Sequence, residues 1–187
     1  TAATVVAAVN RAPGNIQVTA GGAIVDNTAT ETANIQTAGS AILSAGTGIG
    51  TTADAKQIET DVFDLDAVNS GSTGDIVLRQ VTDRLMRVSR LAQTAGGGSG
   101  HILAAASGAR MVVDAGQSGV HVAGSGSVLL TALQTLVLAP VSTTGGHVNM
   151  LGATRVFQAG SVQTGGGSLV VASGQGSIEM FQGAASS

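Results

Sequence analysis

One short pattern of hydrophobic and polar residues recurs along most of the chain. It consists of a small residue, usually glycine, then a polar residue, two aliphatic positions separated by one residue, and finally Ala, Gly or Ser. Alternation over about five residues, bounded by glycine, is typical of a short β-strand. The glycine therefore marks a corner before each strand. The clearest copies are residues 14–18, 33–37, 74–78, 100–104, 126–130, 146–150, 167–171 and 176–180.

Further short strands are expected between these units, so that each repeat carries two or three strands. Equivalent aliphatic positions recur at intervals of about 20 residues over most of the chain, which lengthen to about 26 residues between positions 76 and 128. The aligned pairs are Ile16 with Ile35, Ile24 with Ile42, Ile76 with Ile102, Ile102 with Val128, Val128 with Val148, Val148 with Leu169, and Val156 with Ile178. The intervening strands are residues 23–25, 41–43, 110–113, 120–122, 136–138 and 155–157.

A regular period of this length predicts an all-β protein whose coils stack into a parallel β-helix, or β-solenoid, with about 20–26 residues per coil. Residues 1–187 are then a single segment of seven to nine coils, which we expect to be part of a longer repetitive chain. The alternative is a β-sandwich, which also contains many short strands. Sandwiches usually have more hairpin turns, whereas Asn-Gly and Asp-Gly are absent here.

Two stretches depart from the pattern. Residues 46–51 are interpreted as a glycine corner, followed by an alternating strand over 58–66 with its acidic residues outward. Residues 79–90 hold Arg79, Arg84, Arg87 and Arg90 and fit either a helix or two strands. Strands are favoured because helices are not expected elsewhere.

The composition agrees with a narrow aliphatic core. There are 28 glycines and only three phenylalanines, with no tryptophan or tyrosine. Charged residues make up 10% of the chain and the net charge is −3, so neither a disordered chain nor a nucleic-acid-binding surface is indicated. No apolar stretch approaches the roughly 18 residues of a membrane-spanning helix. The absence of cysteine excludes disulfides and thiol catalysis.

The region from Gly46 to Leu78 resembles repeats of giant bacterial surface proteins of the filamentous haemagglutinin-like class. The resemblance rests on Gly-Thr-Gly-Ile-Gly-Thr at 46–51, Ile-Glu-Thr at 58–60, Leu-Asp-Ala-Val-Asn at 65–69 and Gly-Asp-Ile-Val-Leu at 74–78. Similar Gly-x-Ile-x-Val units extend it over essentially the whole chain. The resemblance implies a right-handed parallel β-helix that is secreted and serves as a stalk or adhesive fibre. Arg87 departs from it, because an aliphatic residue is usual there.

Two groups of side chains are candidates for metal ligands. His101, His121 and His147 are separated by intervals close to the coil period, which would allow them to share one wall of the solenoid. However, His101 and His147 occupy the polar position after the corner glycine, for which an outward, solvated location is expected. The other group, Asp61, Asp64 and Asp66, lacks the spacing of calcium-binding β-rolls. No metal site and no cofactor are therefore predicted.

One cluster is a candidate for an enzymatic site. The arginines of 79–90, together with Asp75 and Asp83, form the one place in the sequence where a glycan-cleaving site of the β-helix lyase type could be assembled. We expect instead that these charges keep a wall of the solenoid soluble. The run Gly96–Gly100 is interpreted as a corner, because it lacks the lysine and the following helix of a phosphate-binding loop.

The expected function is therefore structural or adhesive, without catalysis. We expect a stalk or fibre-forming segment of a bacterial surface protein, secreted to the cell surface. The expected partners are neighbouring coils or other copies stacked end to end, with glycans or proteins of a host or neighbouring cell as further candidates. The alternative is a glycan-binding or glycan-cleaving β-helix of the phage-spike or polysaccharide-lyase type.

Overall fold

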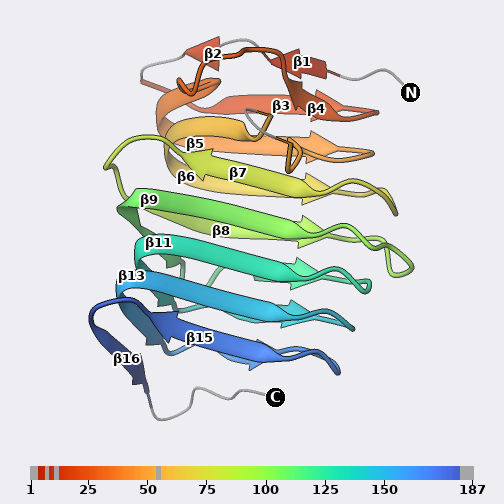
Figure 1. The fold of residues 1–187 in the computed structure, drawn as a ribbon. Coiled ribbons are helices and arrows are strands. Elements are labelled where there is room, and N and C mark those ends of the chain that lie inside the picture. The colour runs from red at the N-terminus through yellow and green to blue at the C-terminus, as the bar shows by residue number, and fades with distance from the viewer. Residues whose placement is uncertain (1–3, 7–8, 11–12, 54–55, 182–187) are drawn as a thin grey trace.

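The computed structural model confirms an all-β protein in which parallel strands stack into a β-solenoid of about seven turns (Figure 1). It describes residues 4–6, 9–10, 13–53 and 56–181. No helix occurs in these ranges. Every strand pairing among them is parallel, as expected when each coil lies on the next.

The strands fall into an upper and a lower group. The upper strands are β1 (Thr4–Val6), β2 (Val9–Asn10), β3 (Ile16–Ala20), β4 (Ile24–Asp26), β5 (Ile35–Ala45), β6 (Ile58–Asn69), β7 (Ile76–Gln80) and β8 (Met86–Gln93). The lower strands are β9 (Ile102–Val113), β10 (Gly119–Val122), β11 (Val128–Val137), β12 (Val141–Thr143), β13 (Val148–Gln158), β14 (Val162–Gln163), β15 (Leu169–Ser173) and β16 (Ser177–Met180).

The lower coils have three walls. Wall A contains β7, β15 and residues 102–106, 128–132 and 148–152. Wall B contains residues 110–113, 134–137 and 155–158 together with β16. Wall C contains β10, β12 and β14. In the upper coils walls B and C are one continuous strand, as in β8, which pairs with wall B through Met86–Val88 and with wall C through residues 90–93.

An aliphatic column runs down the inside of wall A at the start of its strands. Its members are in direct register from coil to coil, and all except the last, which is partly buried, have no exposed surface. Because each side chain packs on the one above, such a column buries apolar surface continuously. From top to bottom the column consists of Ile24, Ile49, Ile76, Ile102, Val128, Val148 and Leu169.

The register of the lower coils confirms the predicted spacings, but two predicted pairs in the upper coils are wrong. Ile16 pairs with Ala41, not with Ile35. Ile24 pairs with Ile49, not with Ile42. Ile49 is thus a buried wall residue, although the sequence pattern placed it in a glycine corner.

Two insertions explain these errors. Between register positions Ile76 and Leu78 the chain has one residue, whereas the coil above has residues 50–57 between Ile49 and Ile58. The coil above that carries a similar excursion over 27–33, between β4 and Asn34. Because of these loops, each early coil holds more residues than the sequence period predicted. Alignment by that shorter period therefore pairs residues that lie at different positions of the coil.

Strands rather than a helix occupy this region, as predicted: residues 79–80 end β7, residues 86–90 begin β8, and a turn over 81–85 joins them. The register shifts close to Arg87, the residue that departs from the family pattern. Leu65 pairs with Val88 and Asp66 with Arg90, which leaves Ser89 as an extra residue. Arg87 itself is only half-buried and is in register with Val112. Since a half-exposed position on the wall does not enter the core, an arginine is accommodated there.

Candidate functional site

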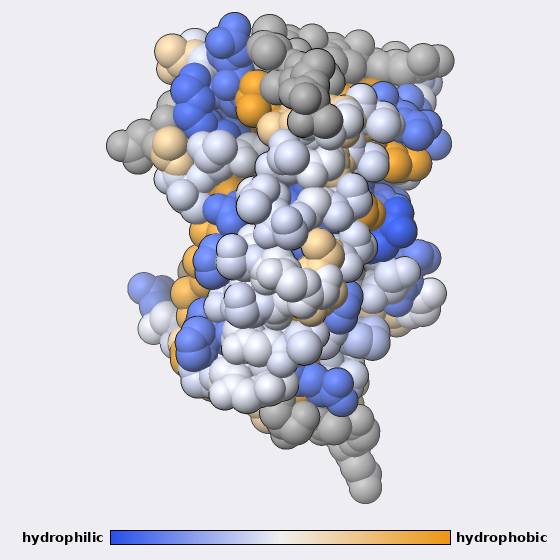
Figure 2. Space-filling model, turned by 90° about the vertical axis from the view of Figure 1, so that its right-hand side faces the viewer, coloured by the Kyte–Doolittle hydropathy of each residue, from blue (hydrophilic) through white to orange (hydrophobic). Residues whose placement is uncertain are grey.

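A column of glycines forms the corner between walls C and A. A β-carbon at Gly126 would lie 1.9 Å from the carbonyl oxygen of Gly100, and one at Gly146 would lie 2.0 Å from that of Gly126. The same close approach recurs at Gly74, Gly100 and Gly167. These distances are far below van der Waals contact, so no other residue fits while the coils stack at their present spacing. Figure 2 views the solenoid from the right-hand side of Figure 1 and shows a strip of near-white residues, of intermediate hydropathy, down the middle of this side.

A polar column lies directly beside it and links each corner to the next. The backbone N–H of His101 donates to Asp75 Oδ1 at 2.8 Å, and that of Ser127 donates to His101 Nδ1 at 3.0 Å. The N–H of His147 donates to Ser127 Oγ at 3.0 Å, and that of Ser168 donates to His147 Nδ1 at 2.9 Å. Each side chain thus accepts a hydrogen bond from the coil below.

These hydrogen bonds fix the role of the ring nitrogens of His101 and His147. Both are exposed, as predicted for the position after the corner glycine. Because a backbone N–H must donate, Nδ1 of His101 and of His147 is an acceptor, and each ring carries its proton on Nε2. His121 lies apart on wall C, where Nδ1 is 2.9 Å from Ser142 Oγ. The structure therefore does not bring the three histidines together.

A second polar column is buried behind the glycines. Asn69 Nδ2 donates to Gln93 Oε1 at 2.8 Å, and Gln93 Nε2 donates to the carbonyl oxygens of Gly74 and His101 at 2.9 and 3.1 Å. Two coils lower, Thr143 Oγ1 lies 2.7 Å from the carbonyl of Gly146. These side chains satisfy corner carbonyls that would otherwise be buried without a partner. Val122 interrupts this column between Gln93 and Thr143. Sequence reasoning missed the column, although an amide or threonine a few residues before several glycine corners was a usable signal.

The arginines singled out in the sequence do not converge on one site. Each arginine contacts one carboxylate, and that carboxylate lies on a different coil from the arginine. Asp83 is exposed in the turn between β7 and β8. Since every guanidinium has its own acidic partner, the cluster is a set of separate ties between coils and not a shared basic pocket. The pairs are Arg79 with Glu31, Arg84 with Asp61, Arg87 with Asp114, and Arg90 with Asp66.

The three aspartates considered for calcium are likewise occupied by protein donors. Asp61 accepts from Thr82 Oγ1 at 2.9 Å and Gln36 Nε2 at 3.0 Å. Asp64 accepts from Ser89 Oγ at 2.6 Å, and Asp66 accepts from Arg90. The described part of the chain holds no group of three or more His, Asp or Glu side chains with the geometry of a metal site.

The acidic residues of 58–66 were expected to point outward, and that prediction is wrong for Asp61, which is 5% exposed, and for Glu59. The Glu59 side chain has no exposed surface, and neither carboxylate oxygen has a hydrogen-bond partner among the described residues. Burial raises the pKa of Glu59, and the nearby carboxylates of Glu31 and Asp26 raise it further. Asp26 is also buried, and its Oδ1 accepts from Thr28 and Asn34 at the start of the 27–33 insertion.

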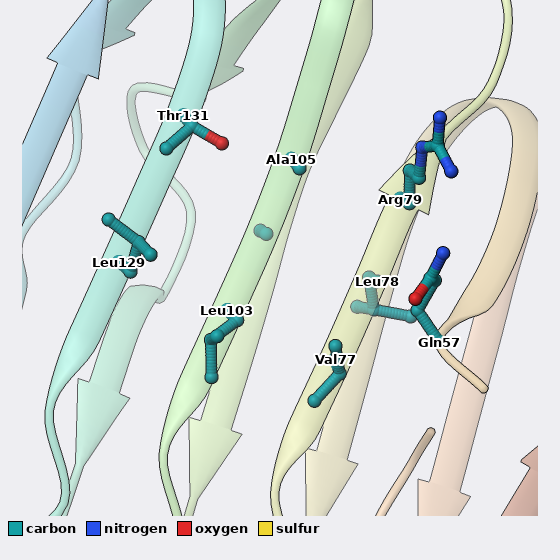
Figure 3. Close-up of a pocket in the computed structure, with 9 residues that line it drawn as sticks. Gln57, Val77, Leu78, Arg79, Leu103, Ala105, Leu129 and Thr131 are labelled. Carbon is teal, nitrogen blue, oxygen red and sulfur yellow. The ribbon is translucent and has the colours of Figure 1, made fainter. Parts of the chain in front are cut away.

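A shallow groove crosses the outer side of wall A. Val77, Leu103 and Leu129 lie side by side on β7, β9 and β11 and form its floor (Figure 3). Gln57 overhangs one end beside Arg79, and a second hollow continues from Leu103 and Leu129 toward the corner. No carboxylate lines either hollow among the described residues. Sequence reasoning did not predict the groove, because its rim depends on the insertion at 51–57.

The lowest described coil exposes apolar side chains on its underside. Ile178 and Met180 are 47% and 55% exposed, whereas Val156 and Gln158, their register partners one coil above, have no exposed surface. Phe181 is 54% exposed and contacts Phe157 with the ring centroids 4.8 Å apart. The side chains that would form the core of a further coil are therefore present but uncovered.

Comparisons with protein-family models, with curated proteins and with solved structures found no match to this chain. The described residues form no helix long and apolar enough to cross a membrane.

Proposed function

We propose that the chain is a structural segment, a stalk or fibre-forming rod of a secreted bacterial surface protein. The observation that carries this proposal is the contrast between the closed coils and the open end. Within the rod, an aliphatic column and a column of glycine corners link successive coils, and a polar column is added from Asp75 to Ser168. At the end, Ile178 and Met180 lie half exposed at positions that are buried one coil above.

Physical chemistry connects this geometry to a mechanical role. Stacked coils interact only with their neighbours, so the fold extends by addition of coils and not by enlargement of a core. An open end of parallel strands presents unpaired backbone groups together with apolar side chains, and both favour pairing with another strand edge. The terminal coil therefore suits a further coil of the same kind, whether from the same chain or from another copy.

Adhesion to glycans or proteins of a host or neighbouring cell belongs to the same proposal. The outer walls offer an apolar groove and exposed Ser, Thr and His side chains at the corners. The four arginines of 79–90 form ion pairs with carboxylates of other coils, which supports a structural role for them. A glycan-cleaving β-helix has less support, because its paired carboxylates would be expected to line a groove.

The test uses electron microscopy and sedimentation velocity on the chain over a range of concentrations. We expect rods that lengthen with concentration and an axial repeat of about 4.8 Å. The variant Ile178→Lys/Met180→Lys should form short particles only, because charge at the open end opposes stacking. Leu133→Lys is the matched control, since Leu133 is 37% exposed on the side of the solenoid.

Rods in the control but not in the end variant support the proposal. If every variant instead formed particles the length of a single chain at every concentration, the proposed end-to-end stacking would be overturned. Circular dichroism of each variant shows whether the β-structure is retained, so loss of folding is not mistaken for loss of stacking.

A further inference from the structure

The outer surface of wall A is uncharged over the lower coils. Its four strand segments from Ile102 downward read Ile-Leu-Ala-Ala-Ala, Val-Leu-Leu-Thr-Ala, Val-Asn-Met-Leu-Gly and Leu-Val-Val-Ala-Ser, with no charged residue among them. Charged side chains by contrast occupy wall B, where Arg110, Arg155 and Glu179 lie. Figure 2 shows hydrophobic colour along the left edge of the lower coils, beside the strip of near-white residues.

The outward residues of wall A form two columns. The first contains Val77, Leu103, Leu129, Asn149 and Val170, and the second contains Arg79, Ala105, Thr131, Leu151 and Ala172, each in register from coil to coil. Successive members are about 4.8 Å apart, as in any sheet. The backbone groups of this wall are already paired with the coils above and below, so a partner contacts it through side chains alone.

We propose that wall A packs face to face against wall A of a second copy, with the two solenoids antiparallel. A two-fold axis along β11 would produce this arrangement and would place Leu129 against Leu129 of the other copy. The partner of a flat sheet face with this side-chain spacing is another sheet with the same spacing, and a second copy supplies it by identity.

The antiparallel arrangement fixes which outward residues meet. It sets Val170, 44% exposed, against Val77, which is 8% exposed in the floor of the groove. It also sets Leu151 against Ala105, a large side chain against a small one, and Leu103 against Asn149. A large side chain opposite a small one favours close packing.

The positions of the charge and of the overhanging loop select antiparallel over parallel packing. Arg79 is the one charged residue among the outward positions of the two columns. In the antiparallel arrangement it faces Ala172, at the margin of the contact. A parallel arrangement would bury Arg79 against Val77 and would bring the loops that carry Gln57 into collision. The antiparallel form instead places each loop beyond the last coil of the other copy.

The size of the contact sets its expected strength. Five coils at about 4.8 Å and strands of five residues at about 3.3 Å give roughly 300–400 Å² per partner. Stable interfaces commonly bury about 800 Å² per partner. We therefore expect reversible, concentration-dependent pairing of this segment.

The experiment is sedimentation equilibrium in the Ile178→Lys/Met180→Lys background, which blocks end-to-end stacking and so separates this test from that of the proposed function. Leu129→Lys and Val170→Lys should each weaken self-association at least tenfold, whereas Leu133→Lys should leave it unchanged. Val170 is already exposed, so its replacement is not expected to disturb folding.

Orientation is tested by single cysteines, because the chain has none of its own. With a short thiol-specific cross-linker, Leu129→Cys should form covalent dimers, and a mixture of Val77→Cys and Val170→Cys proteins should cross-link to each other but not to themselves. Absence of self-association at all concentrations, equal loss in Leu133→Lys, or cross-linking of Val77→Cys to itself would overturn the proposal.

Discussion

The upper and lower coils reach the same stacked architecture by different means. Upper coils carry the two insertions, a continuous strand in place of walls B and C, and ties such as the two hydrogen bonds between Arg90 and Asp66 at 2.8 and 2.9 Å. Lower coils are shorter, have three separate walls, and are joined at their corner by glycines and by the alternating His and Ser side chains. Corner glycines pack against a carbonyl oxygen of the coil above in both halves, as at Gly71 and Gly126. The upper coils differ in the insertions and in the long charged side chains that also bridge them.

The two kinds of contact should differ in how well they tolerate change. A flexible ion pair can adjust when one coil shifts against another, since long side chains have many conformations. A glycine packed against a carbonyl cannot adjust, because the backbone of both coils is fixed by the strands on either side. A corner glycine should therefore be more sensitive to an added methyl group than an ion pair is to the loss of one partner.

The largest effect is expected at the glycine column. Gly126→Ala places a methyl group 1.9 Å from a carbonyl oxygen of the coil above, so the coils must separate or the corner must rebuild. We expect a loss of roughly 3 kcal/mol or more in the free energy of unfolding, measured by urea denaturation. Gly97→Ala is the control, because nothing lies within 4 Å of its added methyl group. Equal stability of the two variants would contradict this account of the corner.

A smaller effect is expected at the buried polar column of the lower coils. Thr143→Val removes the hydroxyl that donates a hydrogen bond to the carbonyl oxygen of Gly146 at 2.7 Å and leaves that buried oxygen without this donor. A loss of roughly 1–3 kcal/mol follows from the unsatisfied group. Thr131→Val, at a half-exposed outward position, should have little effect in the same denaturation assay. If Thr131→Val lowered the free energy of unfolding as much as Thr143→Val, the stabilising role of the buried polar column would be contradicted.

The ion pairs of the upper coils should contribute less than either corner column. Asp66→Asn removes the carboxylate that Arg90 binds, but the two side chains are 25% and 43% exposed. We expect a loss of at most about 1 kcal/mol, which declines as salt is added. Denaturation at low and high ionic strength checks this. A greater loss of stability in Asp66→Asn than in Gly126→Ala would contradict the expectation that an ion pair contributes less than a corner glycine.

The two halves should also respond oppositely to pH at one glutamate each. The pKa of buried Glu59 is raised, so the folded state holds the proton more tightly and loses stability as pH rises through that pKa. Glu59→Gln should therefore raise the Tm at neutral pH and lose this advantage below pH 4.5, the ordinary value for glutamate.

Glu179 provides the contrast. Hydrogen bonds from Arg155 and Ser177 lower its pKa, so its contribution is present at neutral pH and is lost as the pH falls. Glu179→Gln should lower the Tm slightly at pH 7 and have no effect in acid. Thermal unfolding followed by circular dichroism between pH 4 and 8 measures both variants. A lower Tm of Glu59→Gln at neutral pH would contradict the assignment of a buried, unpartnered carboxylate.

Local patterns in the sequence were sufficient to predict the β-solenoid, the glycine corners, the outward position of His101 and His147, and the register of the lower coils. These features follow from alternation and from a regular period, which can be recognised without knowing how the coils pack. Packing between coils set the register of Ile24 with Ile49, the burial of Glu59, the separate partners of the four arginines and the groove over Val77. Each of these depends on residues about 20 to 50 positions apart. The two insertions change which residues become neighbours between coils, and no local pattern records that change.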